Sequence, residues 1–170
     1  MVRWFPIQRS LTVAGLYLVG LLTVCSIYAC KNVKQMNSSQ ITHAFRLRPG
    51  DDVKQSILQY IAEHKITAGY IITCVGSLTD YNIRFANQTD GTKGHGHFEI
   101  VSMTGVLSTE GSHIHLSISD STGKTIGGHL MDGCKVYTTA EIVIGEERSK
   151  IFTRELDSTF GYKELKVVSQ

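Results

Sequence analysis

The sequence of 170 residues has few of the residues that mark fibrous, disordered or disulfide-rich proteins. It contains only two prolines and four cysteines, and charged residues make up 19% of the chain against 42% hydrophobic residues. This composition excludes collagen-like, low-complexity and disulfide-dense proteins and is typical of a globular protein. The length is enough for one ordinary domain.

Acidic residues are absent from the first 35 positions, which hold four basic residues. From Met36 onward, thirteen basic side chains are balanced by fifteen acidic ones, so this part of the chain carries a slight negative net charge. A slightly acidic domain is poorly suited to hold nucleic acid through phosphate contacts. We therefore expect nucleic acid to be an unfavoured partner.

Charge of either sign is absent from residues 11–30. A helix of twenty residues is about 30 Å long, which matches the hydrocarbon core of a membrane. Because Arg3 and Arg9 precede this run, residues 1–35 are interpreted as an apolar leader and linker, either a signal peptide or a transmembrane anchor, with Cys30 as a candidate for lipidation. The protein is expected to be anchored in the membrane through residues 11–30 or exported. If translation starts at Met36, it is expected to be cytoplasmic.

Hydrophobic periodicity after residue 40 predicts one helix and a series of strands. Asp52 is the expected N-cap of the helix, with Gln55 three residues later, and Val53, Ile57 and Ile61 form its apolar face. Strand patterns cover residues 43–48, 69–75, 81–86, 98–107, 113–119, 136–144, 150–156 and 164–168, and residues 87–96 have the composition of a polar loop. The sequence predicts a single compact α+β domain, a mostly antiparallel β-sheet packed with one main helix.

Three histidines are candidates for a metal site. In the strand predicted over residues 113–119, alternate residues are apolar, so His113 and His115 project from the face turned away from the core. His129 follows two glycines, which allow close approach of the backbone. Three neutral imidazoles with an open fourth position suit zinc or a similar divalent ion. The alternative interpretation is that these histidines are polar residues that face water.

Other side chains give weaker signals. His95 and His97 form a second His-x-His pair, but they lie in a glycine-rich segment whose backbone is less defined. Glu99 lies between apolar residues, where a carboxylate is an exposed residue, a subunit contact or an acid near the metal. A nucleophile elbow, a phosphate-binding loop and a dinucleotide fingerprint are all absent from the sequence.

Several short motifs follow one another in a fixed order. They are Arg46-Leu47-Arg48-Pro49-Gly50-Asp51-Asp52-Val53, Gly76-Ser77-Leu78, Gly96-His97-Phe98-Glu99-Ile100-Val101-Ser102, Gly111-Ser112-His113-Ile114-His115 and Gly127-Gly128-His129-Leu130. A tail with Phe152-Thr153-Arg154-Glu155 and Gly161-Tyr162-Lys163-Glu164 comes after them. Together these motifs resemble the PPC domain, the "plants and prokaryotes conserved" family, over residues 41–168.

The resemblance implies a homotrimer and a metal site formed by His113, His115 and His129, as in the stand-alone, prokaryote-like members. The chain lacks the Arg-Gly-Arg-Pro hook of the plant DNA-binding members and keeps the histidines, so it is similar to the stand-alone type. The resemblance also implies an interaction strip. This strip consists of Gly96, His97, Phe98, Glu99, Ile100 and Val101.

Three functions are compatible with these residues. The first is a non-catalytic homotrimeric module that binds a divalent metal, zinc being the expected ion, and contacts a small ligand or a protein partner. The second is a metal-dependent enzyme with an open coordination position and Glu99 as general base. The third is a DNA-binding regulator, which the charge of the domain and the missing hook disfavour.

Overall fold

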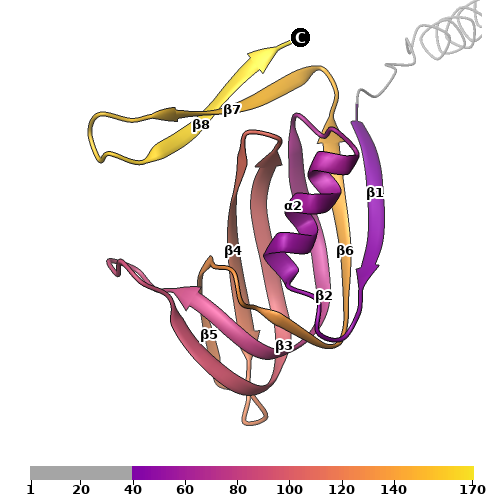
Figure 1. Ribbon diagram of the computed structural model, residues 1–170, viewed down its shortest axis with the longest axis vertical. Coiled ribbons are helices and arrows are strands. Elements are labelled where there is room, and N and C mark those ends of the chain that lie inside the picture. The colour runs from indigo at the N-terminus through magenta and orange to yellow at the C-terminus, as the bar shows by residue number, and fades with distance from the viewer. Residues whose placement is uncertain (1–39) are drawn as a thin grey trace, which may run out of the picture. The chain divides into compact units, whose positions relative to one another are not determined.

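The computed structural model describes residues 40–170, which form a curved antiparallel sheet, one helix and a terminal hairpin (Figure 1). The elements are β1 (Gln40–Leu47), α2 (Val53–Glu63), β2 (Gly69–Arg84), β3 (Thr92–Ser108), β4 (Gly111–Ser119), β5 (Thr125–Leu130), β6 (Lys135–Glu147), β7 (Lys150–Leu156) and β8 (Lys163–Ser169). Strands of the main sheet are ordered β1-β6-β2-β3-β4-β5, and all their pairings are antiparallel. The predicted α+β class, with one main helix on a mostly antiparallel sheet, is confirmed.

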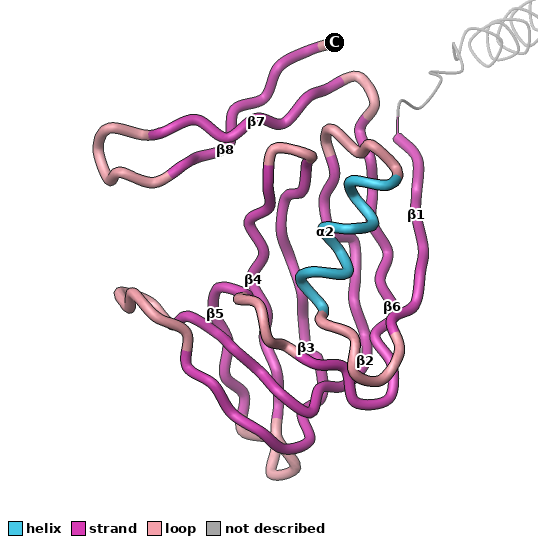
Figure 2. The backbone as a smooth tube through the Cα atoms, viewed as in Figure 1, coloured by secondary structure: helices cyan, strands magenta, loops and turns pink. Residues whose placement is uncertain are grey.

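Helix α2 covers one face of the sheet, as Figure 2 shows. Its first turn is capped by Asp52, whose Oδ1 accepts a hydrogen bond from the backbone N–H of Gln55 at 3.2 Å. Val53, Ile57 and Ile61 are buried and belong to the same apolar core as the inward side chains of the sheet. The expected N-cap and apolar face of the helix are therefore both present.

The strands differ from the expectation at three places. Residues 69–84 form one irregular strand, β2, instead of two. Strand β3 begins at Thr92, inside the segment expected to be a loop, and there Gly94 lies under the ring of Tyr81, where a Cβ would meet ring atoms at 2.4 Å. Strand β5 was not expected, because two glycines interrupt its alternation of apolar and polar residues.

Strand β5 joins two parts of the sheet. It pairs along β4, and its end also pairs with the end of β2, where Ile83 lies opposite Leu130 and Arg84 lies opposite His129. The sheet curls so that the ends of β2 and β5 meet beside the middle of β4. This closure positions the histidine site described below.

The β7–β8 hairpin extends away from the main sheet (Figure 1). Near its base, the backbone N–H of Phe152 donates to the carbonyl oxygen of Thr67 at 2.9 Å. Leu156, Phe160 and Tyr162 are all exposed in spite of their apolar surface. A two-stranded hairpin is only marginally stable by itself, so these side chains leave the hairpin short of packing partners in a single chain.

The expectation of membrane attachment requires correction. The one helix in residues 40–170 has eleven residues, and none there is long and apolar enough to cross a bilayer. The structure therefore supports neither the predicted membrane anchoring or export nor the assignment of a signal peptide or transmembrane segment. The leader over residues 1–35, including the apolar run 11–30 and Cys30, lies outside the described residues.

Candidate metal centre

The three candidate histidines lie together on two neighbouring strands. His113 and His115 are two residues apart on β4, where Ile114 and Leu116 face the core between and beside them. His129 lies directly opposite His115 in the β4–β5 register. Residues that face each other across two strands have Cβ atoms about 5 Å apart, so this register alone brings the third ring to the other two.

The glycine pair before His129 makes this register possible. A Cβ on Gly128 would meet the backbone oxygen of Arg84 at 2.5 Å, and one on Gly127 would meet the Ser117 side chain at 2.4 Å. The close approach of backbone that the sequence predicted at these glycines is therefore observed, since β5 lies tightly between β4 and the end of β2.

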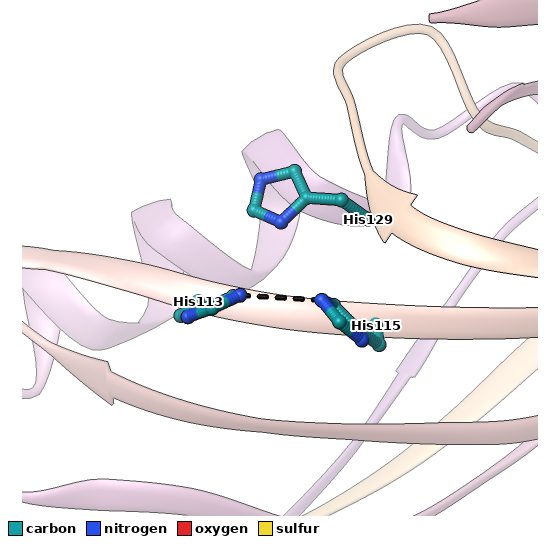
Figure 3. A group of neighbouring side chains, drawn as sticks. All are labelled: His113, His115 and His129. Carbon is teal, nitrogen blue, oxygen red and sulfur yellow. Dashed lines mark hydrogen bonds between the residues drawn. The ribbon is translucent and has the colours of Figure 1, made fainter. Parts of the chain in front are cut away.

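Ring geometry in the cluster suits a tetrahedral ion. One potential ligand atom from each histidine lies within 4.8 Å of the others, and Nε2 of His113 is 3.2 Å from Nε2 of His115. Nitrogens bound at about 2.0 Å to tetrahedral zinc are separated by about 3.3 Å. Figure 3 shows the His129 ring approaching from its own strand toward the gap between the other two.

One buried nitrogen in the cluster has no hydrogen-bond partner. Nδ1 of His129 is buried and has no hydrogen-bond partner among the described residues. A buried polar atom without a partner costs free energy, and a bound ion or ligand is one way to satisfy it. This atom and the spacing of the rings show that the three residues present could hold a metal ion.

Electrostatics keeps two of the rings neutral. Burial, followed by the positive charge of Arg84, lowers the pKa of His129 to about 4. Burial, followed by the neighbouring His115 and Arg154, also lowers the pKa of His113. Neutral imidazole is the form that binds metal, so neither ring has to release a proton near neutral pH.

A cavity of about 590 Å³ opens beside the cluster. His113 and His129 form part of its wall, and side chains from the end of β2, from the loop after it and from the β7–β8 hairpin form the rest. These other lining residues are Arg84, Asn87, Gln88, Thr89, Arg154, Tyr162, Lys163 and Glu164. An ion at the histidines would therefore have direct access to a cavity large enough for a small molecule.

The second His-x-His pair does not join this cluster. Nδ1 of His95 is hydrogen-bonded to Oδ1 of Asp80 at 2.8 Å, and the ring of His97 stacks on Tyr137 with centroids 4.3 Å apart. Each ring has a local partner of its own.

Glu99 lies apart from the three histidines within one chain. It pairs with Ser119, four residues beyond His115 along β4. At about 3.3 Å per residue the separation is about 13 Å, which is too far for contact with an ion held by the histidines of the same chain. Its role as a general base stays a prediction that this placement does not favour.

Sequence reasoning did not place the charged side chains of the cavity. Arg84, Arg154, Lys163 and Glu164 come from three separate strands that meet only in the folded chain. One signal was available for Arg84, since it is a polar position within the alternating run over residues 81–86. Nothing in the local sequence indicates that Arg154 or Lys163 lies near a histidine.

Fold and site together define a small α+β domain with a three-histidine cluster at a strand junction. The chain belongs to the Plants and Prokaryotes Conserved (PCC) domain family, whose model matches residues 34–148. The resemblance on which the sequence analysis relied is thereby confirmed.

Curated relatives extend far beyond this domain. The chain is 38% identical over 125 residues to a bifunctional protein GlmU from a Synechococcus strain, which covers 74% of this chain and 20% of that protein. A GlmU of a second Synechococcus strain matches with the same identity and coverage. The chain therefore spans about a fifth of the length of these relatives.

Solved structures support the same fold. A hypothetical protein from Salmonella is 40% identical with a TM-score of 0.76, and the match covers 78% of this chain and 96% of that one. A metal-containing protein from Archaeoglobus fulgidus is 23% identical with a TM-score of 0.64, over 74% and 93% of the two chains. A proposed DNA-binding protein from Ralstonia eutropha is 21% identical with a TM-score of 0.65, over 78% and 99%.

Proposed function

We propose that this chain is a non-catalytic, homotrimeric PCC-domain module that binds a divalent metal, zinc in the first place, through His113, His115 and His129. The observation that carries the metal assignment is the convergence of three imidazoles whose spacing suits a tetrahedral ion. Three protein ligands leave a fourth position open, which is available to a small ligand from the adjoining cavity. The similarity in fold to a metal-containing protein is consistent with this function.

The proposed trimer contact is the sheet face that α2 does not cover. Val75 on β2 and Glu141 on β6 are paired in register and point away from the core, because their neighbours Cys74 and Ile142 are buried. Val75 is 55% exposed, and Val101 on β3 is 56% exposed. Apolar side chains this exposed on central strands favour burial against another chain.

The proposed interaction strip, residues 96–101, lies on β3 and ends at the exposed Val101. Its exposed members His97 and Glu99 are the polar part of that surface, and Phe98 and Ile100 point into the core. An alternation of this kind leaves every second side chain free to contact a partner chain. We propose this strip as the polar border of the contact between copies.

Metal content tests the proposal directly. Purified full-length chain, dialysed against zinc and then against metal-free buffer, is expected to retain one zinc per chain. His129→Ala and His113→Ala are each expected to lose most of it, while the exposed His64→Ala variant retains it. Wild-type protein without stoichiometric metal under these conditions would contradict the proposed site.

A metal-dependent enzyme is the second candidate, and one observation favours it. The carboxylate of Glu164 lines the same cavity as His113 and His129, where it could act on a metal-bound water. Turnover of a hydrolysable substrate that is lost in Glu164→Gln with zinc retained would favour the enzyme. The same result for Glu99→Gln would assign the base to a residue of a neighbouring chain. DNA affinity that falls steeply with salt would instead favour the DNA-binding regulator.

A further inference from the structure

Three cationic side chains without carboxylate partners surround the cavity. Arg84 lies at the end of β2, Arg154 on β7 and Lys163 on β8, and within residues 40–170 none of the three forms an ion pair. Glu164 is the one carboxylate in the lining. Three cations against one carboxylate give the wall of this cavity a positive net charge, which favours an anionic ligand.

The cationic side chains and two of the histidines line the same cavity. Arg84 lies directly opposite His129 in the β2–β5 register and lines the cavity, and its guanidinium donates to the carbonyl oxygen of Gln88 at 3.2 Å. Arg154 lies on the other side, with its Cγ 3.9 Å from where a Cβ of Gly111 would be, just before His113 on β4. An ion at the histidines and the two guanidinium groups would thus all face the same cavity, where one ligand could contact all three.

We propose that the cavity binds a small oxyanion, a carboxylate or a phosphate, with one oxygen on the open position of the metal and the others paired with Arg84 and Arg154. This inference rests on the metal site proposed above. Guanidinium groups present planar donor pairs that match both carboxylate and phosphate oxygens. The cavity of about 590 Å³ has the size of a small-metabolite site, and the amide and hydroxyl groups of Asn87, Gln88 and Thr89 supply further polar contacts.

The β7–β8 hairpin supplies the part of this site that lies outside the match to the family model. Arg154, Lys163 and Glu164 all lie after residue 148, where the match to the family model ends. The histidines, in contrast, lie within the matched residues. The hairpin therefore supplies three of the cavity's four lysine, arginine and acidic side chains, and Arg84 on β2 supplies the fourth.

Cobalt substitution provides a readout that does not depend on any activity. Full-length chain loaded with Co²⁺ is titrated with inorganic phosphate and, separately, with malonate, and the visible absorption of the ion is followed. An oxygen that enters the open position changes this spectrum. Arg154→Gln and Arg84→Gln are compared with Arg148→Gln, which removes the same charge at an exposed site on the β6–β7 turn.

We expect wild type and Arg148→Gln to respond alike, and the two cavity variants to keep the cobalt spectrum but to need at least tenfold more anion. A stronger response to phosphate would identify phosphorylated ligands, and a stronger response to malonate would identify carboxylates. Cobalt bound without any response to either anion, or equal responses in all variants, would overturn the inference and leave the metal site intact. Failure to bind cobalt would instead remove the metal site, and this inference with it.

Discussion

The protonation state of a histidine in the cluster depends on the residues around it as well as on the imidazole itself. His129 is held neutral because its ring is buried and faces Arg84, and both effects lower its pKa to about 4. The same arginine faces the cavity that the ring lines. One residue therefore favours both the neutral ligand form of the histidine and the binding of an anion next to it.

Asp80 offers a test of electrostatics away from this cluster. Hydrogen bonds from His95 and Thr79 lower the pKa of its carboxyl below the usual 3.8. We expect a carbon NMR titration to show this lowered pKa, and His95→Ala to raise it toward 3.8. The Asp80 side chain is 40% exposed, so high salt reduces the shift in its pKa.

The direction of the accompanying pH dependence follows from this lowering. Because the folded pKa of Asp80 lies below the unfolded one, its contribution to stability is present above pH 3.8 and is lost as the pH falls through the folded value. Urea unfolding of wild type and His95→Ala should therefore differ more at pH 5 than at pH 2. An equal difference at both pH values would contradict the assigned partner.

At the scale of elements, the register of β5 decides whether the site exists. Gly128→Ala would push its methyl group against the backbone oxygen of Arg84 and displace β5 from the end of β2. No ligand is removed, but His129 moves, and we expect zinc affinity to fall by about tenfold or more, as for other changes that disturb the orientation of a ligand. Competition with a coloured chelator measures this affinity.

Ser121→Ala is the control for this variant. Ser121 lies in the exposed turn between β4 and β5 and contributes nothing to either pairing. It is expected to bind zinc as wild type does. Unchanged affinity in Gly128→Ala would show that the β2–β5 contact does not position His129.

A second element-scale prediction concerns the start of α2. Asp52 is only 7% exposed, and its carboxylate accepts from the backbone N–H of Gln55 at 3.2 Å and from that of Gly133 at 2.7 Å. Its side chain also lies 3.6 Å from the Lys135 ammonium. Asp52→Ala removes the helix cap and leaves Gly133 without its partner, so we expect a loss of about 1–3 kcal/mol in the free energy of unfolding, measured with urea.

The neighbouring Asp51 provides the comparison for Asp52. It is exposed, and its side chain accepts one hydrogen bond, from the backbone N–H of Arg48 at 2.7 Å. Asp51→Ala is expected to cost clearly less than Asp52→Ala. If Asp51→Ala cost more stability than Asp52→Ala, the hydrogen bond between Asp52 and Gly133 would contribute little to stability.

Elements with strong periodicity were predictable from the sequence, and β5 was not. The strict alternation of residues 113–119 showed which face carries His113 and His115, and Asp52 with three apolar residues at helical spacing marked α2. The strand that carries His129 is concealed by its two glycines, whose purpose becomes visible only against the backbone of β2. Arg154 and Lys163 reach the cavity through a hairpin whose position depends on tertiary contacts rather than on local pattern.

At the scale of the whole molecule, the sheet face opposite α2 exposes apolar side chains to solvent. Val75 and Val101 are more than half exposed on neighbouring central strands, and the hairpin residues Phe160 and Tyr162 are 78% and 64% exposed. A single chain leaves this apolar surface in water, which is unfavourable at about 25 cal/mol for each Å². Assembly with further copies would bury it.

Light scattering after size exclusion tests the proposed assembly. The wild-type chain is expected to have three times the 18.8 kDa mass of one chain. Val101→Glu places a charge on the proposed contact and is expected to yield single chains, because burying an unpaired carboxylate is costly. The matched Val101→Thr variant keeps a β-branched side chain of similar size without a charge and should remain trimeric. A trimer that persists in Val101→Glu would place the contact elsewhere on the chain, and a wild-type monomer would contradict the assembly itself.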